Sequence, residues 1–115
     1  MTALIFKICH AAEWALAVAQ ARYDGTAKDR EDGFLHFSAQ DQLIGTLEKW
    51  YADAHDLILV AVDADALGDA LRWEPSRDGA LFPHLYGPLP LSAVHWSGAI
   101  GRNAQGGFIL PAAPA

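Results

Sequence analysis

The chain has 115 residues, and its 14 acidic and 8 basic side chains give a formal net charge of −6. This length suits one domain around one hydrophobic core, which we expect to span residues 1–110, followed by a frayed tail at 111–115. The basic residues are scattered and form no stripe, which argues against a nucleic-acid partner. The sequence contains no apolar run of about 18 residues, so we expect no membrane span.

The compartment is predicted from the N-terminus and from cysteine usage. The first residues carry no basic region ahead of their apolar run, so we expect them to belong to the fold and not to a signal peptide. The single cysteine, Cys9, excludes an internal disulfide and suits a reducing environment. We therefore predict a cytoplasmic protein.

Residues 3–33 are expected to form a strand, a helix and a loop. Residues 3–10 alternate as in a strand, and His10 ends that strand on the face of Phe6 and Ile8. Residues 11–22 are rich in alanine, lack glycine and proline, and carry apolar side chains at helical spacing. Residues 24–33, DGTAKDREDG, are the most polar stretch, so we predict a loop that is either a solvated connector or a lid.

Residues 32–38, DGFLHFS, are predicted to form a turn and then a strand. Phe34, His36 and Ser38 would share one face of it, because side chains alternate along a strand. A histidine and a serine in so apolar a stretch indicate a polar face that lines a pocket. Ser38 has a second interpretation, because S-A-Q-D resembles a capping box and predicts a helix over 39–52 with Ser38 as its N-cap.

The remainder of the chain has mainly the patterns of strands. Residues 56–63, DLILVAVD, form a continuous apolar run of strand length, which predicts a central strand. Further strands are predicted at 70–75, 81–90, 93–100 and 107–110. The order of strand, helix, helix and then several strands predicts an α+β fold.

Three histidines are candidates for a functional site. His10, His36 and His84 each lie among large apolar residues, at or within a predicted strand. Buried imidazoles need hydrogen-bond partners, and polar partners are scarce in these stretches, so we predict that the three converge on one pocket. We expect Ser38 and Tyr86 at its rim, and Phe34 in contact with the ligand.

Metal binding and cysteine chemistry are less well supported by the pattern. Three histidines would suit zinc with one open position, but their spacing matches no metal-ligand motif, so no metal is predicted. Cys9 and His10 are neighbours on a strand and point to opposite faces, so Cys9 is not expected to use His10 as a base.

Three motifs together resemble a small bacterial family catalogued as domain of unknown function 952: I-C-H ending at His10, D-G-F-L-H-F-S-A-Q-D-Q-L at 32–43 and F-P-H-L-Y-G-P-L at 82–89. The resemblance implies a fold similar to the ADP-ribosyltransferase fold, with a split mixed or antiparallel sheet and two main helices around a nicotinamide-dinucleotide cleft. It also implies that His10, on the first strand, holds the dinucleotide. Transferases of this fold commonly have a catalytic glutamate on a late strand. Here the late strands carry no acidic residue, and the nearest earlier glutamate is Glu74.

Three functions therefore stay open, all with a small-molecule ligand. The first is an enzyme acting on NAD or a related nucleotide, with His36 and His84 as catalytic groups and with ligand contacts from His10, Ser38, Tyr86 and Phe34. The second is a non-catalytic small-molecule sensor, which the missing late acid favours. The third is a metal-assisted hydrolase that uses His10, His36 and His84. The sequence leaves the oligomeric state open.

Overall fold

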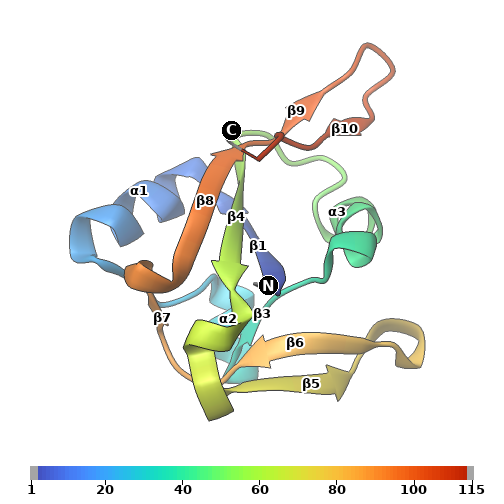
Figure 1. The fold of residues 1–115 in the computed structure, drawn as a ribbon. Helices are drawn as coiled ribbons and strands as arrows, with labels where there is room; N and C mark the ends of the chain where they lie inside the picture. The colour runs from blue at the N-terminus through green and yellow to red at the C-terminus, as the bar shows by residue number, and fades with distance from the viewer. Residues whose placement is uncertain (1–2, 114–115) are drawn as a thin grey trace.

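The computed structural model describes residues 3–113, in which antiparallel strands and short helices surround a three-stranded sheet (Figure 1). The helices are α1 (Ala11–Gln20), α2 (Ala27–Asp32) and α3 (Leu43–Trp50), with 3₁₀ turns at Gln40–Gln42, Ala64–Ala70, Arg77–Gly79 and Leu91–Ala93. The strands are β1 (Leu4–His10), β2 (Arg22–Tyr23), β3 (Leu35–His36), β4 (Leu57–Asp63), β5 (Leu71–Pro75), β6 (Leu81–Leu85), β7 (Leu89–Pro90), β8 (Val94–Ala99), β9 (Gly101–Arg102) and β10 (Phe108–Ile109).

The predicted α+β class is confirmed. Every strand pair formed within residues 3–113 is antiparallel, in sheets of order β1-β4-β8, β3-β6-β5, β2-β7 and β10-β9. The helices of this part of the chain are all too short or too polar to cross a bilayer.

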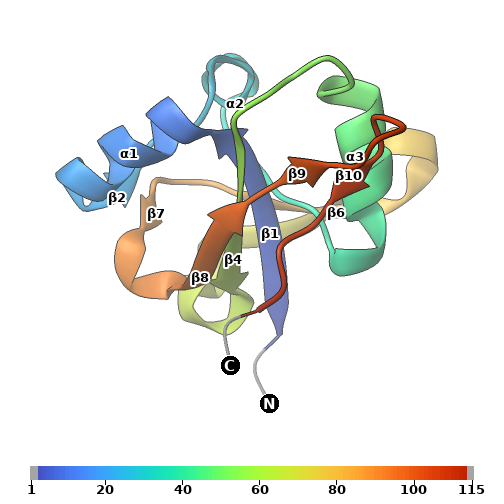
Figure 2. The ribbon, with the colours of Figure 1, turned by 90° about the horizontal axis from the view of Figure 1, so that it is seen from above.

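The sheet β1-β4-β8 separates two hydrophobic cores. Its middle strand, β4, is the apolar run predicted to be central, and burial on both faces explains why that run does not alternate. Helix α1 packs on one face through Trp14 and Ala17, and α3 packs on the other through Leu43 and Leu47. The two helices lie on opposite sides of the sheet in both views (Figures 1 and 2).

The two three-stranded sheets meet at one β-bridge. Odd-numbered residues of β1 face β4, as the flanking bonds from Ala11 N–H to the Asp56 carbonyl (2.7 Å) and from Ala64 N–H to the Ala3 carbonyl (2.9 Å) establish. Even-numbered residues therefore turn their backbone groups to the other edge. There, Phe6 and Ser38 exchange two hydrogen bonds of 2.8 Å. Beyond this bridge the chains diverge, because β3 pairs with β6 instead.

The loop predicted at residues 24–33 is wrong, because most of it is helix α2. Thr26 Oγ1 accepts a hydrogen bond from Asp29 N–H (3.1 Å), and Thr26 N–H donates to Asp29 Oδ2 (2.8 Å). This reciprocal capping box starts a helix in a segment with no apolar periodicity. Gly33 ends the helix with a left-handed φ of 86°.

The prediction of Ser38 as a helix N-cap is also wrong. Helix α3 starts only at Leu43, after a 3₁₀ turn in which Ala39 N–H donates to Gln42 Oε1 (2.9 Å). The N–H and carbonyl of Ser38 are hydrogen-bonded to Phe6. Its hydroxyl contacts Thr46 Oγ1 (3.0 Å) and caps no helix.

The first helix and the C-terminal tail differ from their predicted boundaries. The helix predicted over 11–22 ends at Gln20, where Ala21 adopts a left-handed φ of 61°. In the predicted tail, Pro111 lies against Gly98, and residues 114–115 lie outside the described residues.

The turn before α2 provides a test of this packing. Gly25 has a φ of +104°, and a Cβ there would lie 2.5 Å from Leu35 Cδ2 and 2.8 Å from Asp29 Cβ. Gly25→Ala should therefore lower the free energy of unfolding through left-handed strain of ~1–2 kcal/mol and overpacking of ~1–3 kcal/mol. Gly33→Ala is the matched control, because φ is +86° there but a Cβ meets nothing within 4 Å. Urea unfolding that gives equal losses for both variants would contradict this packing.

Candidate functional site

A cleft of about 90 Å³ opens where β1 and β3 diverge. Strand β1 contributes Phe6, Lys7 and Ile8 to its lining, α2 contributes Lys28 and Asp29, and α3 contributes Thr46 and Trp50. The other polar side chains that line it are Thr26, Lys28, Asp29, His36, Ser38, Thr46, Tyr51, Ser76 and His84.

The floor of the cleft holds a buried ion pair. Lys7 Nζ lies 2.7 Å from Asp29 Oδ2, and the two side chains are 4% and 1% exposed. The ammonium also donates to the His36 carbonyl (2.8 Å), and the carboxylate accepts from the backbone N–H of Thr26 (2.8 Å) and of His36 (3.0 Å). Each charge thus has at least two hydrogen-bonding or ion-pair partners, which buried charges need in order to be tolerated.

The surroundings of the ion pair shift the pKa of both partners. Burial by itself raises the pKa of Asp29, but the hydrogen bond from His36 and the charge of Lys7 outweigh it, so this pKa lies well below its usual range. Burial lowers the pKa of Lys7, and the charge of Asp29 offsets this in part. Asp29 is therefore a carboxylate at all pH values near neutrality.

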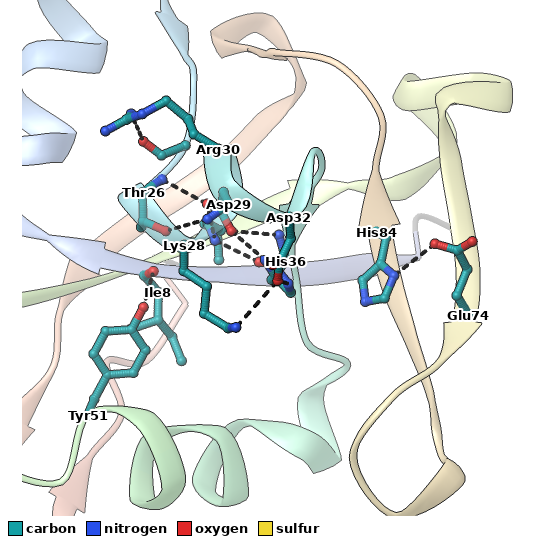
Figure 3. A network of polar contacts seen from close by, with 12 residues as sticks. Ile8, Thr26, Lys28, Asp29, Arg30, Asp32, His36, Tyr51, Glu74 and His84 are labelled. Carbon is teal, nitrogen blue, oxygen red and sulfur yellow. Dashed lines mark hydrogen bonds and ion pairs between the residues drawn. The ribbon is translucent and has the colours of Figure 1, made fainter.

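His36 is held between two carboxylates (Figure 3). Its Nδ1 lies 2.6 Å from Asp29 Oδ1 and its Nε2 lies 2.9 Å from Asp32 Oδ2. The Nδ1 contact is a hydrogen bond, whereas the Nε2 contact is at ion-pair distance only. The two acidic side chains thus place negative charge on both sides of the ring.

His84 is arranged differently. It is the register partner of His36 across β3 and β6, and the two ring centroids are 5.5 Å apart. Its Nδ1 lies 2.9 Å from Glu74 Oε1, which also accepts a hydrogen bond from the Tyr86 hydroxyl (2.7 Å). These bonds, with that from Tyr86 the stronger, lower the pKa of Glu74. A carboxylate at Nδ1 fixes the proton there and leaves Nε2 as the acceptor.

The backbone of Ile8 adds a further binding group. Ile8 is buried, lines the cleft and directs its N–H and carbonyl away from β4. Its carbonyl accepts only a long bond from the Tyr51 hydroxyl (3.4 Å), and its N–H has no partner among residues 3–113. Burial raises the pKa of Tyr51 to about 12, so that phenol stays a donor. Buried amides are rarely unpaired, so this edge is suited to a ligand or a water.

The predicted site residues fall into three groups. His36, His84 and Ser38 line the cleft. Phe34 and Tyr86 lie just behind it, since the Phe34 ring stacks on His84 at 4.2 Å and lies 5.2 Å from that of Tyr86. His10 is not brought into the cleft: it is exposed at the end of β1, its ring is 6.2 Å from that of Tyr51, and its N–H donates to Glu13 Oε1 (2.9 Å).

The structure also includes residues that the sequence analysis did not assign to the site. Lys7 lies on the β1 face opposite to His10, and Asp29 falls in the segment predicted as a loop. The Thr26-x-x-Asp29 capping signature was the available signal for Asp29. No group of three His, Cys, Asp or Glu side chains in residues 3–113 is placed to hold a metal ion, so the three-histidine metal site has no geometric support.

Asp29→Asn should be strongly destabilising, because it leaves the Lys7 ammonium buried without its counter-charge. The expected loss is ~3–5 kcal/mol in the free energy of unfolding, measured by urea denaturation. Asp24→Asn is the matched control, since its partner Arg22 and Asp24 itself are 62% and 42% exposed. The control should lose at most ~1 kcal/mol, and a loss of that size for Asp29→Asn would contradict the buried pair.

The pH dependence of stability should also depend on Asp29. Because folding lowers this pKa, the stabilisation it provides is complete above the unfolded value of about 4 and is lost as the pH falls further. The stability difference between the native chain and Asp29→Asn should therefore shrink between about pH 5 and about pH 2. A difference that stays constant over this range would contradict the assignment.

Comparison with known proteins identifies relatives along nearly the whole chain. A family model described as protein of unknown function (DUF952) matches residues 8–97. The crystal structure of protein CC0527 from Caulobacter crescentus is 46% identical, with a TM-score of 0.87 over 92% of this chain and 93% of that one. The solution NMR structure of CC0527 is 47% identical, with a TM-score of 0.81 over 90% of each chain. No curated protein matches the sequence. The chain therefore belongs to the DUF952 family.

Proposed function

We propose that the cleft binds a nucleotide-type small molecule, with NAD or a fragment of it as the first candidate, and that His84 acts on the bound molecule as a general acid or base. The observation that carries the proposal is the pair of adjacent imidazoles, His36 and His84, each with a carboxylate on Nδ1. The nicotinamide dinucleotide comes from the resemblance to the ADP-ribosyltransferase fold described above.

The different surroundings of the two histidines support different roles. His36 has both ring nitrogens engaged by Asp29 and Asp32, which suits a positive charge that binds and orients an anionic group. His84 has only Nδ1 engaged, and no hydrogen bond within residues 3–113 involves its Nε2. An oriented imidazole with a vacant acceptor nitrogen is the usual arrangement of a general base.

The lining of the cleft supports an anionic ligand with an amide-like edge. Lys7 and Lys28 line it against one carboxylate, Asp29, although the whole chain carries a net charge of −6. The N–H and carbonyl of Ile8 offer a donor and an acceptor side by side, which matches a carboxamide or the edge of a base. Phe6, Phe37 and Phe82 provide apolar walls between these groups.

The second candidate is a non-catalytic sensor that binds the same ligand. It is favoured by the placement of Glu74, which lies behind His84 and bonds to Tyr86, and is absent from the residues that line the cleft. In that case Glu74 only holds His84 in place, and the one carboxylate among residues 3–113 that lines the cleft, Asp29, is already bonded to Lys7 and His36.

Ligand binding can be tested by thermal shift with NAD, nicotinamide mononucleotide and ADP-ribose. A ligand at ten times its dissociation constant adds RT ln 11, about 1.4 kcal/mol, which raises Tm by roughly 4 °C or more in a domain of this size. His84→Ala should abolish the shift. His95→Ala, which changes an exposed histidine outside the cleft, should keep it. A flat response of the native chain to all three compounds would contradict the proposed ligand class.

The enzyme and the sensor differ in what Glu74→Gln does. If His84 is a general base, this change should lower turnover of NAD by roughly 100-fold or more while leaving the Kd nearly unchanged, because base catalysis contributes about 10²–10⁴-fold. Binding without turnover in the native chain would support the sensor instead.

A further inference from the structure

An exposed tryptophan stands at the mouth of the cleft. Trp50 is the last residue of α3, lines the cleft and leaves 55% of its surface in contact with water. Trp73, on β5, is similarly exposed at 47% but is absent from the cleft lining. Exposed aromatic surface at a binding cleft offers a flat apolar platform at little entropic cost, because the side chain has only two rotatable bonds.

Two ammonium groups from different helices approach this ring. Lys28 Nζ, from α2, lies 4.7 Å from the ring centroid, and Lys49 Nζ, from α3, lies 5.3 Å from it. The chain holds 8 basic residues in total, so two of them beside one side chain is a local concentration of positive charge. We call Trp50, Lys28 and Lys49 the Trp50 rim.

The contacts within the rim are weak enough to be exchanged for a ligand. Lys28 is also paired with Asp32 at 3.3 Å, but the two side chains are 49% and 33% exposed. Exposed ion pairs and exposed cation–π contacts each contribute only about 0–1 kcal/mol. Lys28 can therefore turn to a stronger anion at small cost.

Lys28 also links the rim to the cleft. Its partner Asp32 also lies 2.9 Å from His36 Nε2, so Asp32 contacts both the rim and the cleft (Figure 3). Lys28 and Trp50 line the same cleft as His84, so a ligand held at the rim would extend toward His84.

We propose that the Trp50 rim is a subsite for a planar aromatic ring that bears an anionic group, with the ring on Trp50 and the anion on Lys28 and Lys49. This inference deepens the proposed function, on which it rests, by assigning the outer part of the ligand. For a nucleotide, the ring is the base and the anion is a phosphate.

The test uses probes that separate ring from charge: 1-naphthyl phosphate, cyclohexyl phosphate, 1-naphthol and NAD. Binding is followed through the indole N–H signals in ¹H–¹⁵N spectra of the full chain, with the signal of Trp50 identified by its loss in Trp50→Leu. The Trp50 signal should move with 1-naphthyl phosphate and NAD, and that of Trp73 should not. The affinity should fall as salt is added, because the anion contacts are exposed.

Two variants and one control test how much each part of the rim contributes to ligand affinity. Trp50→Leu should weaken 1-naphthyl phosphate and NAD by roughly 5- to 100-fold, the usual range for loss of one stacking platform. Lys28→Gln should weaken the binding of 1-naphthyl phosphate and of NAD by about 2- to 5-fold and reduce the salt dependence. Cyclohexyl phosphate, which lacks the aromatic ring, and 1-naphthol, which lacks the phosphate, should bind the native chain more weakly than 1-naphthyl phosphate. Trp73→Leu is the matched control and should leave all affinities unchanged.

The outcomes separate this inference from the proposed function. If NAD binds and loses affinity in His84→Ala but not in Trp50→Leu, the rim subsite is wrong and the proposed function stands. If 1-naphthyl phosphate binds through Trp50 and NAD does not bind, the rim subsite stands and the proposed ligand is wrong. If neither probe moves the Trp50 signal, the rim is not a ligand subsite.

Discussion

The buried ion pair between Lys7 and Asp29 is the constraint on which the cleft depends. Removing two charges from water costs several kcal/mol per ion, and their attraction offsets this only with good geometry and further hydrogen bonds. Here those bonds come from Thr26 and His36, so the pair joins β1, the start of α2 and β3. An apolar pair of the same volume would avoid the desolvation cost. Stability alone therefore does not account for the buried charges, and we infer that their role is to position His36.

The strands β1 and β3 separate beside this ion pair. β1 and the segment at Ser38 share one bridge, and β3 then turns to β6 because His36 and Leu35 pair with His84 and Leu85. Lys7 and Asp29 fill the base of the resulting gap, where the Ile8 N–H has no partner among residues 3–113 and its carbonyl has only the long bond from Tyr51. Two histidines side by side thus receive opposite surroundings. Two carboxylates flank His36, whereas one carboxylate bonds to His84 and leaves its Nε2 without a hydrogen bond in residues 3–113. This difference is the basis of the separate binding and proton-transfer roles that we propose for the two rings.

Local patterns predicted the framework better than the site. The run at 57–63 and the alanine-rich segment after His10 gave the central strand and α1, because their burial is a property of consecutive residues. Helix α2 was missed because its six residues have no apolar face, and only the Thr26–Asp29 cap marks it. His10 was expected in the cleft and Lys7 was not, since a lysine within a strand is usually exposed and its buried partner lay in a presumed loop. The contact of Glu74 with His84 depends on the register of β5 and β6, which no local pattern specifies.

The proposed ligand site can be tested most directly by following the imidazole nitrogens of all five histidines in long-range ¹H–¹⁵N spectra while NAD or ADP-ribose is added. His36 and His84 face the cleft, whereas His10, His55 and His95 are exposed outside it. We expect the ring nitrogens of His36 and His84 to shift together with one saturation curve, and those of the other three to stay in place. Unchanged signals for His36 and His84 at saturating ligand, or shifts confined to the exposed histidines, would contradict a ligand site organised by the Lys7–Asp29 pair.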